Sequence, residues 1–417
     1  MSDTSTAEKG TPLDLLDERL RHGSGLRPAL GALLDRVRSG DLGALPIIAG
    51  LVVIWSVFQS LNSVFLSSAN LVNLLMESVS LGVIALGVVC VLLVGQIDLS
   101  VGSVSGVSAA LTAVTFADAG WPMVPSLAVA IAAGCAIGWV YAQMVNRLGV
   151  PSFVATLAGL LSFLGVQLYL LGDTGAINLP YDSGLVRFAQ VSFVPAWLSY
   201  LLVVVAAGWL FATGYARARA RRAAGLSARS TALLVIRSAA LLLGLGYAAW
   251  YLNRDRGVGW MFVGFVVLVL LMNYALTRTG WGRSVFAVGG NAEAARRAGI
   301  NVRRVYTTMF VLCSSLAALG GILAAARLAA ANQASGAGDV NLNAIAAAVI
   351  GGTSLFGGRG SAFAALLGIL VIQSISNGLT LLDLDSSFRF VITGLVLALA
   401  VALDSVARRS RTAHGRA

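Results

Sequence analysis

Apolar residues dominate the chain in long runs, and short polar stretches separate these runs. A helix that crosses a bilayer needs about 20 consecutive apolar residues, and many of the runs reach this length. The sequence therefore predicts an all-α, polytopic integral membrane protein. We expect about twelve transmembrane or re-entrant segments, at residues 45–66, 70–95, 100–118, 124–146, 151–172, 193–215, 231–253, 260–278, 305–329, 343–357, 361–384 and 387–405.

Two of these segments, 100–118 and 343–357, are short or rich in glycine and serine, so we expect them to be re-entrant or broken. The stretches beside them, Val94–Gly102 and Ile350–Gly358, share glycine, leucine and glycine at one common offset. Nonhelical backbone within a membrane is tolerated where protein buries it or where it lines a cavity. Paired glycine-broken segments therefore favour a transport pathway. Glycine-mediated helix packing is the alternative.

The polar stretches divide the chain into a cytoplasmic N-terminal arm, a transmembrane domain and a cytoplasmic tail. The arm has apolar residues at helical spacing from Leu26 to Val37, which fits either an interfacial helix or a loose solvated arm. The expected boundaries are 1–44, 45–405 and 406–417, with an arginine-rich cytoplasmic loop at 216–230 and a second cytoplasmic loop at 279–304.

The net charge of +11 comes from arginines in the polar stretches, and no basic patch alternates with exposed aromatics. Topology explains this charge better than nucleic-acid binding does. An even number of crossings returns both termini to one side, and most of the arginines fall on that side. We therefore expect a multi-pass membrane protein with both termini in the cytoplasm.

Residue types needed for enzyme chemistry are scarce. Cys90, Cys135 and Cys313 lie in apolar segments without metal-ligand spacing, and the two histidines lie in the polar tails. A phosphate-binding P-loop needs a lysine after its last glycine, but the single lysine, Lys9, is followed by Gly-Thr-Pro. We expect no catalytic residue, no metal and no cofactor on this chain, which is not an enzyme by itself.

The loop 279–304 contains a short helix with both ends specified. Asn291 is a suitable N-cap, Glu293 lies in the first turn, Arg296 and Arg297 lie in the last turn, and Gly299 supplies a left-handed stop. This helix, at 292–298, is too short to span a bilayer.

Three alanines of this helix, Ala294, Ala295 and Ala298, share a face that another protein could approach closely. Docking of a partner is one interpretation. The other is that the arginines only mark the cytoplasmic side.

Polar residues within the apolar segments are candidates for a substrate pathway, because such groups are costly in lipid. Asp98 is favoured as a cap of the following helix, whereas substrate contact and interhelical hydrogen bonding are equally compatible with Glu77. The candidate pathway residues are Asn73, Glu77, Asp98, Ser100, Gly102, Thr353, Gly358, Gln373 and Asn377.

Three stretches of the chain resemble one protein family. Residues 95–106 (GQIDLSVGSVSG), 282–305 (GRSVFAVGGNAEAARRAGINVRRV) and 344–361 (AIAAAVIGGTSLFGGRGS) are similar to the permease subunits of ribose-, arabinose- and xylose-type ABC sugar importers. The loop 216–230 resembles an insertion of the xylose-type members. Gln96 departs from the family pattern, in which an acidic residue or glycine precedes Ile-Asp-Leu-Ser.

The resemblance implies a permease homodimer in the bacterial cytoplasmic (inner) membrane. It also implies cytoplasmic ATPase subunits, which bind ATP and Mg²⁺, and an extracytoplasmic sugar-binding protein. The leading hypothesis is therefore an ATP-driven importer of a monosaccharide, with xylose or a related pentose preferred. An ion-coupled secondary sugar transporter is the alternative, and the scarcity of carboxylates and histidines in the spans argues against it. A nontransporting scaffold is disfavoured by the paired glycine-broken segments.

Overall fold

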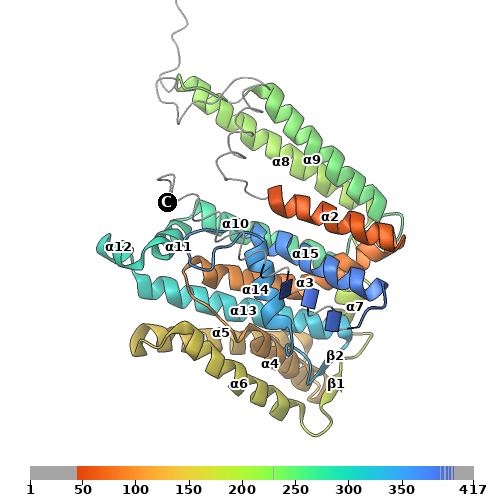
Figure 1. Cartoon of the computed structure of the whole chain (residues 1–417), viewed down its shortest axis with the longest axis vertical. Coiled ribbons are helices and arrows are strands. Elements are labelled where there is room, and N and C mark those ends of the chain that lie inside the picture. Colours follow the sequence, from red (N-terminus) through yellow and green to blue (C-terminus); the bar gives the residue numbers. More distant parts are fainter. Residues whose placement is uncertain are drawn as a thin grey trace, which may run out of the picture. The chain divides into compact units, whose positions relative to one another are not determined.

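The computed structural model describes residues 45–228 and 230–385, together with a few residues between 387 and 398. The described chain is almost entirely helical (Figure 1). Its described residues form two compact units, one of residues 194–257 and one of residues 45–193 and 258–385.

The larger unit contains most of the helices and a two-stranded antiparallel sheet in which Ile177 lies opposite Ala331. Its elements are α2 (Leu45–Leu61), α3 (Ser68–Leu93), α4 (Val101–Ala113), a π-helical turn (Val114–Asp118), α5 (Met123–Leu148), α6 (Ser152–Leu171), β1 (Ala176–Asn178), α7 (Gly184–Gln190), α10 (Trp260–Arg278), α11 (Gly280–Gly290), α12 (Ala292–Arg297), α13 (Val302–Leu328), β2 (Ala330–Asn332), α14 (Val340–Ile350) and α15 (Phe363–Leu381).

The core of this unit forms around α13, which packs against α3, α4 and α5. Small residues allow the close approach. A Cβ at Gly321 would lie 2.0 Å from the carbonyl oxygen of Ser105, and one at Gly138 would lie 2.4 Å from that of Phe310. Helices in a membrane gain little from hydrophobic burial against each other, so close backbone packing of this kind holds them together.

The smaller unit is a hairpin of two long helices, α8 (Ala196–Ala223) and α9 (Thr231–Leu252). Within the predicted loop 216–230, α8 continues to Ala223. Alanine and arginine are strong helix formers, so the helix extends beyond its apolar part. Only Ala224 to Ser230 connects the two helices, and Arg221 Nε donates a 2.7 Å hydrogen bond to the Ser227 carbonyl there.

The described residues contain 9 helices long and apolar enough to cross a membrane, and two shorter apolar helices, α2 and α14. They correspond to eleven of the predicted segments, and the twelfth, 387–405, lies largely outside the described residues. The count of twelve thus stays a prediction. The N-terminal arm and the tail after 405 also lie outside the described residues.

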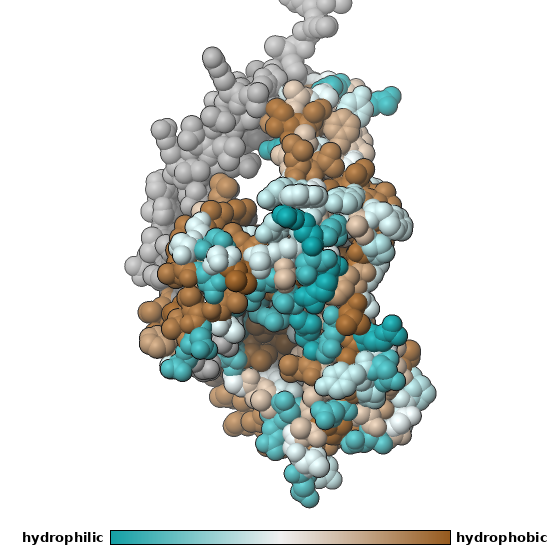
Figure 2. Space-filling model, turned by 90° about the vertical axis from the view of Figure 1, so that its right-hand side faces the viewer, coloured by the Kyte–Doolittle hydropathy of each residue, from teal (hydrophilic) through white to brown (hydrophobic). Residues whose placement is uncertain are grey.

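Helices of the larger unit run across the view in Figure 1, with α12 at the left end and α7 and the strands at the right end. Figure 2 shows the face at that right end. Hydrophilic residues gather in the middle of this face, and hydrophobic residues lie along its sides. This distribution is the one expected where helices leave a bilayer and where their flanks contact lipid.

Candidate functional site

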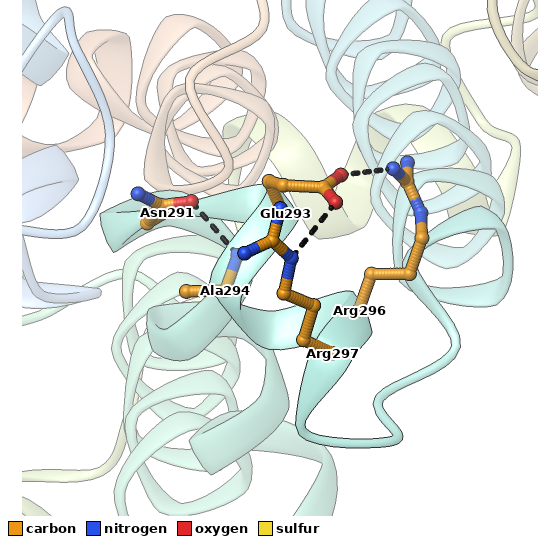
Figure 3. A network of polar contacts seen from close by, with 5 residues as sticks. All are labelled: Asn291, Glu293, Ala294, Arg296 and Arg297. Carbon is orange, nitrogen blue, oxygen red and sulfur yellow. Dashed lines mark hydrogen bonds and ion pairs between the residues drawn. The ribbon is translucent and has the colours of Figure 1, made fainter.

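The predicted short helix is confirmed as α12. Asn291 Oδ1 accepts a 2.9 Å hydrogen bond from the Ala294 N–H (Figure 3). At the other end, the Ile300 N–H donates to the Ala295 carbonyl and the Gly299 N–H donates to the Arg296 carbonyl, both at 3.0 Å. With Gly299 at φ +84°, this pair of bonds is a Schellman motif, which ends the helix at a defined residue.

Both arginines of α12 turn back onto Glu293. Arg296 Nη1 lies 2.5 Å from one carboxylate oxygen, and Arg297 Nε lies 3.3 Å from the other (Figure 3). All three side chains are more than half exposed. Pairs at this spacing stabilise a helix by only about 0.2–0.5 kcal/mol each. Their main consequence is that α12 presents a fixed, polar, solvated surface.

The three alanines that the sequence predicted on one exposed face, Ala294, Ala295 and Ala298, differ in their exposure. Ala295 is only 5% exposed and belongs to the hydrophobic core of the larger unit, whereas Ala294 and Ala298 are exposed. Ala295 therefore packs the helix against its own chain, and the exposed surface at this helix consists of Ala294, Ala298 and the charged side chains.

The end of α11 packs against the backbone of two other segments. A Cβ at Gly289 would lie 1.9 Å from the Leu93 carbonyl oxygen and 2.6 Å from the Gly358 nitrogen. The Gly358 N–H in turn donates a 2.9 Å hydrogen bond to the Leu93 carbonyl. We call this contact of Leu93, Gly289 and Gly358 the glycine junction. It joins α11, and through it α12, to both glycine-rich segments.

The weak similarity between the two glycine-rich segments does not extend to their conformation. Gly95 has φ +72°, but Gly351 at the matching offset is right-handed, and Gly102 is helical where Gly358 has φ +72°. The two segments instead touch each other, since a Cβ at Gly357 would lie 2.8 Å from the Gly95 nitrogen. The two segments are therefore neighbours in the fold and not two copies of one local conformation.

Asp98 lies in the turn that leads into α4 and is 1% exposed. Its Oδ1 accepts hydrogen bonds from the Ser100 N–H at 2.8 Å and from the Ser100 hydroxyl at 2.7 Å. The predicted structural role holds in a modified form, because Asp98 closes the turn before α4 instead of capping the first N–H groups of the helix. Its Oδ2 is buried without a hydrogen-bond partner among the described residues.

Gly102 lies on the buried face of α4, where the loop after β2 crosses it. Its N–H donates to Asn341 Oδ1, and a Cβ there would lie 2.4 Å from the Gly336 carbonyl oxygen. One turn further along α4, the fully buried Gln167 of α6 donates to the Ser335 carbonyl at 2.7 Å. Gly102 therefore serves close packing of this loop, and Gln167 and Asn341 are contacts that the sequence pattern did not identify.

Two polar pairs connect α3 to α15. Gln373 Nε2 donates to Glu77 Oε2 at 2.9 Å, and the amides of Asn70 and Asn377 exchange two hydrogen bonds, at 2.8 and 3.1 Å. The sequence predicted the residues Glu77, Gln373 and Asn377 but not that they pair across these helices. Nearly 300 residues separate the partners, so no local pattern could reveal the pairing.

These pairs differ in exposure. Asn70 is 9% exposed, whereas Glu77 is exposed at the surface of the larger unit, one turn after the half-buried Asn73. Thr353, the remaining candidate, is 2% exposed, and its hydroxyl has no partner among the described residues. The candidates therefore form separate groups rather than one pocket. No cluster of metal-ligating side chains occurs in the described part of the chain.

Comparison with known proteins gives consistent results. The family model described as "Branched-chain amino acid transport system / permease component" matches residues 70–401. The xylose transport system permease protein XylH of Escherichia coli is 34% identical over 89% of this chain and 94% of its own length. XylH of Haemophilus influenzae is 31% identical over 89% and 98%. No solved structure matches.

The ribose import permease protein RbsC of Escherichia coli is 30% identical over 85% of this chain and 91% of its own length. The match thus extends over nearly all of the membrane-spanning part. The chain belongs to this family of transport-system permeases and is a multi-pass membrane permease of the ABC sugar-importer type, within the group that includes the xylose and ribose permeases.

Proposed function

We propose that this chain is the membrane-spanning subunit of an importer that carries xylose or a related pentose across the inner membrane, as one half of a homodimer. The greater identity to the xylose permeases than to the ribose permease supports the pentose assignment. ATP and Mg²⁺ bind to separate cytoplasmic subunits, and a sugar-binding protein delivers the substrate from the other side.

The observation that carries this proposal is the connection of α12 to the glycine junction. The helix α12 is too short to enter the membrane, and its surface is polar. Only Ile300 and Asn301 separate Gly299 from α13, so the connection between α12 and α13 is too short to absorb a movement of α12. We assign α12 the role of receiving the ATPase, with α11 and α13 passing its movement to the spans.

The face of α3 and α15 that holds Glu77 and Gln373 fits the sugar path. An ionised carboxylate in a span costs about 2.5–3.5 kcal/mol when it faces lipid, so an exposed glutamate there faces water or protein. A neutral sugar offers only hydroxyl groups, which a carboxylate and an amide can bind without a cofactor. The sugar path between the two permease copies of the homodimer then includes Glu77 and Gln373 of each copy.

The test is reconstitution in proteoliposomes with the ATPase and the sugar-binding protein encoded in the same genome. Xylose with its binding protein should stimulate ATP hydrolysis and uptake, ribose should do so less, and omission of the ATPase should abolish uptake. Uptake by this chain alone under a proton or sodium gradient would instead establish the ion-coupled alternative.

A further inference from the structure

An apolar groove of about 590 Å³ opens between α10, α11 and α13. Its α10 wall contains Leu268, Leu271 and Ala275, and its α13 wall contains Val311 and Leu312. This volume lies within the range of about 300–1,000 Å³ that is typical of pockets for small molecules. Leu271 is 61% exposed, so the groove opens outward from the helix bundle and faces the surroundings of the spans.

A hydrogen bond and a buried side chain hold the walls of the groove in place. At its α12 end, Trp281 Nε1 of α11 donates a 3.1 Å hydrogen bond to Thr308 Oγ1 of α13, and both residues line the groove. In its α10 wall, Met272 is 8% exposed, and its sulfur lies 3.8 Å from the Cys90 sulfur of α3. The tryptophan therefore marks the polar end, where aromatic side chains gather at a membrane interface.

The groove and the arginine beyond it together cover the depth of one lipid leaflet, because its α10 residues Leu268 to Ala275 span about 10 Å and Arg278 lies about 5 Å further along the helix. From Leu268 to Arg278 the helix rises by about 15 Å at 1.5 Å per residue. The hydrocarbon core of a bilayer is about 30 Å thick, so this distance is half of it. One acyl chain that descends from the interface would lie along the groove.

Two arginines lie beyond the end of the groove that Trp281 marks, one on each of the helices that form its walls. Arg278 follows Ala275 by three residues on α10, and Arg304 precedes Thr308 by four residues on α13, so helical geometry places each on the stripe of its wall. Both are exposed, and neither forms an ion pair with any residue that the structure describes. An apolar channel with two unpaired cations at its mouth complements an amphiphile with a negative head.

We propose that this groove binds one anionic phospholipid, with an acyl chain between α10 and α13 and the phosphate at Arg278 and Arg304. Basic side chains between spans attract anionic head groups by about 1 kcal/mol per residue near the surface, which corresponds to about a fivefold change in affinity. Since the groove adjoins α11, the bound lipid holds the membrane end of the helix that leads to α12.

The test is native mass spectrometry of the purified, delipidated chain in a neutral detergent. The protein is titrated with phosphatidylglycerol or with phosphatidylcholine of the same acyl chains. The wild-type chain should bind phosphatidylglycerol more tightly than phosphatidylcholine. Arg278→Gln and Arg304→Gln should each lower that affinity about fivefold and leave phosphatidylcholine unchanged, and Ala275→Phe should weaken both lipids by filling the groove.

Matched controls are Arg187→Gln, an exposed arginine at the end of α7, and Val267→Phe, an exposed position of α10 outside the groove. Both should bind as wild type does. Should Ala275→Phe aggregate, Val311→Phe fills the groove from the other wall. Equal affinity for the two lipids, or unchanged binding in the filled variants, would overturn the proposal. Loss of the dimer in the filled variants without loss of lipid would assign the groove to a second copy of the chain.

Discussion

At the level of single residues, adjacent glycines at the end of α11 have opposite environments. A Cβ at Gly289 would lie 1.9 Å from the Leu93 carbonyl oxygen, whereas nothing lies within 4 Å of one at Gly290. We therefore predict that Gly289→Ala separates α11 from the glycine junction and reduces sugar-stimulated ATP hydrolysis by at least tenfold, because backbone atoms on both sides must move.

The matched control for this prediction is Gly290→Ala, which adds the same methyl group to the same helix. It should keep wild-type hydrolysis and thermal stability. Both quantities are measured on the purified complex with its ATPase. Equal activity of the two variants would show that the junction does not carry the coupling.

The two polar pairs between α3 and α15 give a second residue-level prediction. Glu77→Gln keeps a hydrogen-bonding side chain opposite Gln373 but removes the charge, so sugar uptake should fall while the melting temperature stays within about 2 °C. Asn377→Ala removes the donor to Asn70 Oδ1, while Asn70 Nδ2 still donates to the Phe65 carbonyl, and a buried acceptor without a partner costs about 1–3 kcal/mol. The melting temperature should therefore drop. Uptake and thermal unfolding measured on the same preparations separate these outcomes, and a normal rate of uptake in Glu77→Gln would place the sugar path elsewhere.

At the level of elements, α12 could be predicted from the sequence because its determinants lie within nine residues. The cap at Asn291, the ion pairs of Glu293 and the stop at Gly299 are local interactions, and the structure has all of them. The glycine junction could not be predicted, because Leu93 and Gly289 are almost 200 residues apart and a glycine in sequence does not show which backbone approaches it. The burial of Ala295 was missed for the same reason.

The role of α12 yields a prediction for the whole element. Gly299→Val places a β-branched residue at φ +84°, which costs about 1–2 kcal/mol and alters the path into α13. Ala298→Trp adds bulk to the exposed face without changing the exit. Both variants should insert and dimerise but lose copurifying ATPase.

The control for bulk is Ala224→Trp, at an exposed position after α8. Pull-down of the ATPase through a tag on the permease measures the effect. Retention of the ATPase by Ala298→Trp would show that α12 does not contact it on this face.

At the level of the whole molecule, the sequence predicted the spans well, because a run of about 20 apolar residues has few structural alternatives. It did not predict which spans lie inside. Of the most apolar 18 residues of each helix, 78% are buried in α3 and only 11% in α8, although both helices are strongly apolar. Lipid and protein interior are about equally apolar, so hydropathy cannot separate them, and small residues at close contacts decide the packing.

The distribution of arginines predicts the orientation of the chain and yields the last prediction. If arginine-rich ends lie in the cytoplasm, the turn after α8 and the end of α12 lie there, and the loop before α7 lies outside. On a background in which Cys90, Cys135 and Cys313 are replaced by alanine, Ala224→Cys and Ala298→Cys should resist an impermeant thiol reagent in intact cells and react after lysis. Asp182→Cys, which is exposed before α7, should react in intact cells. Since Cys90 and Cys313 are fully buried, their replacement should leave the surface unchanged. The opposite labelling pattern would invert the topology and remove α12 from the reach of a cytoplasmic ATPase.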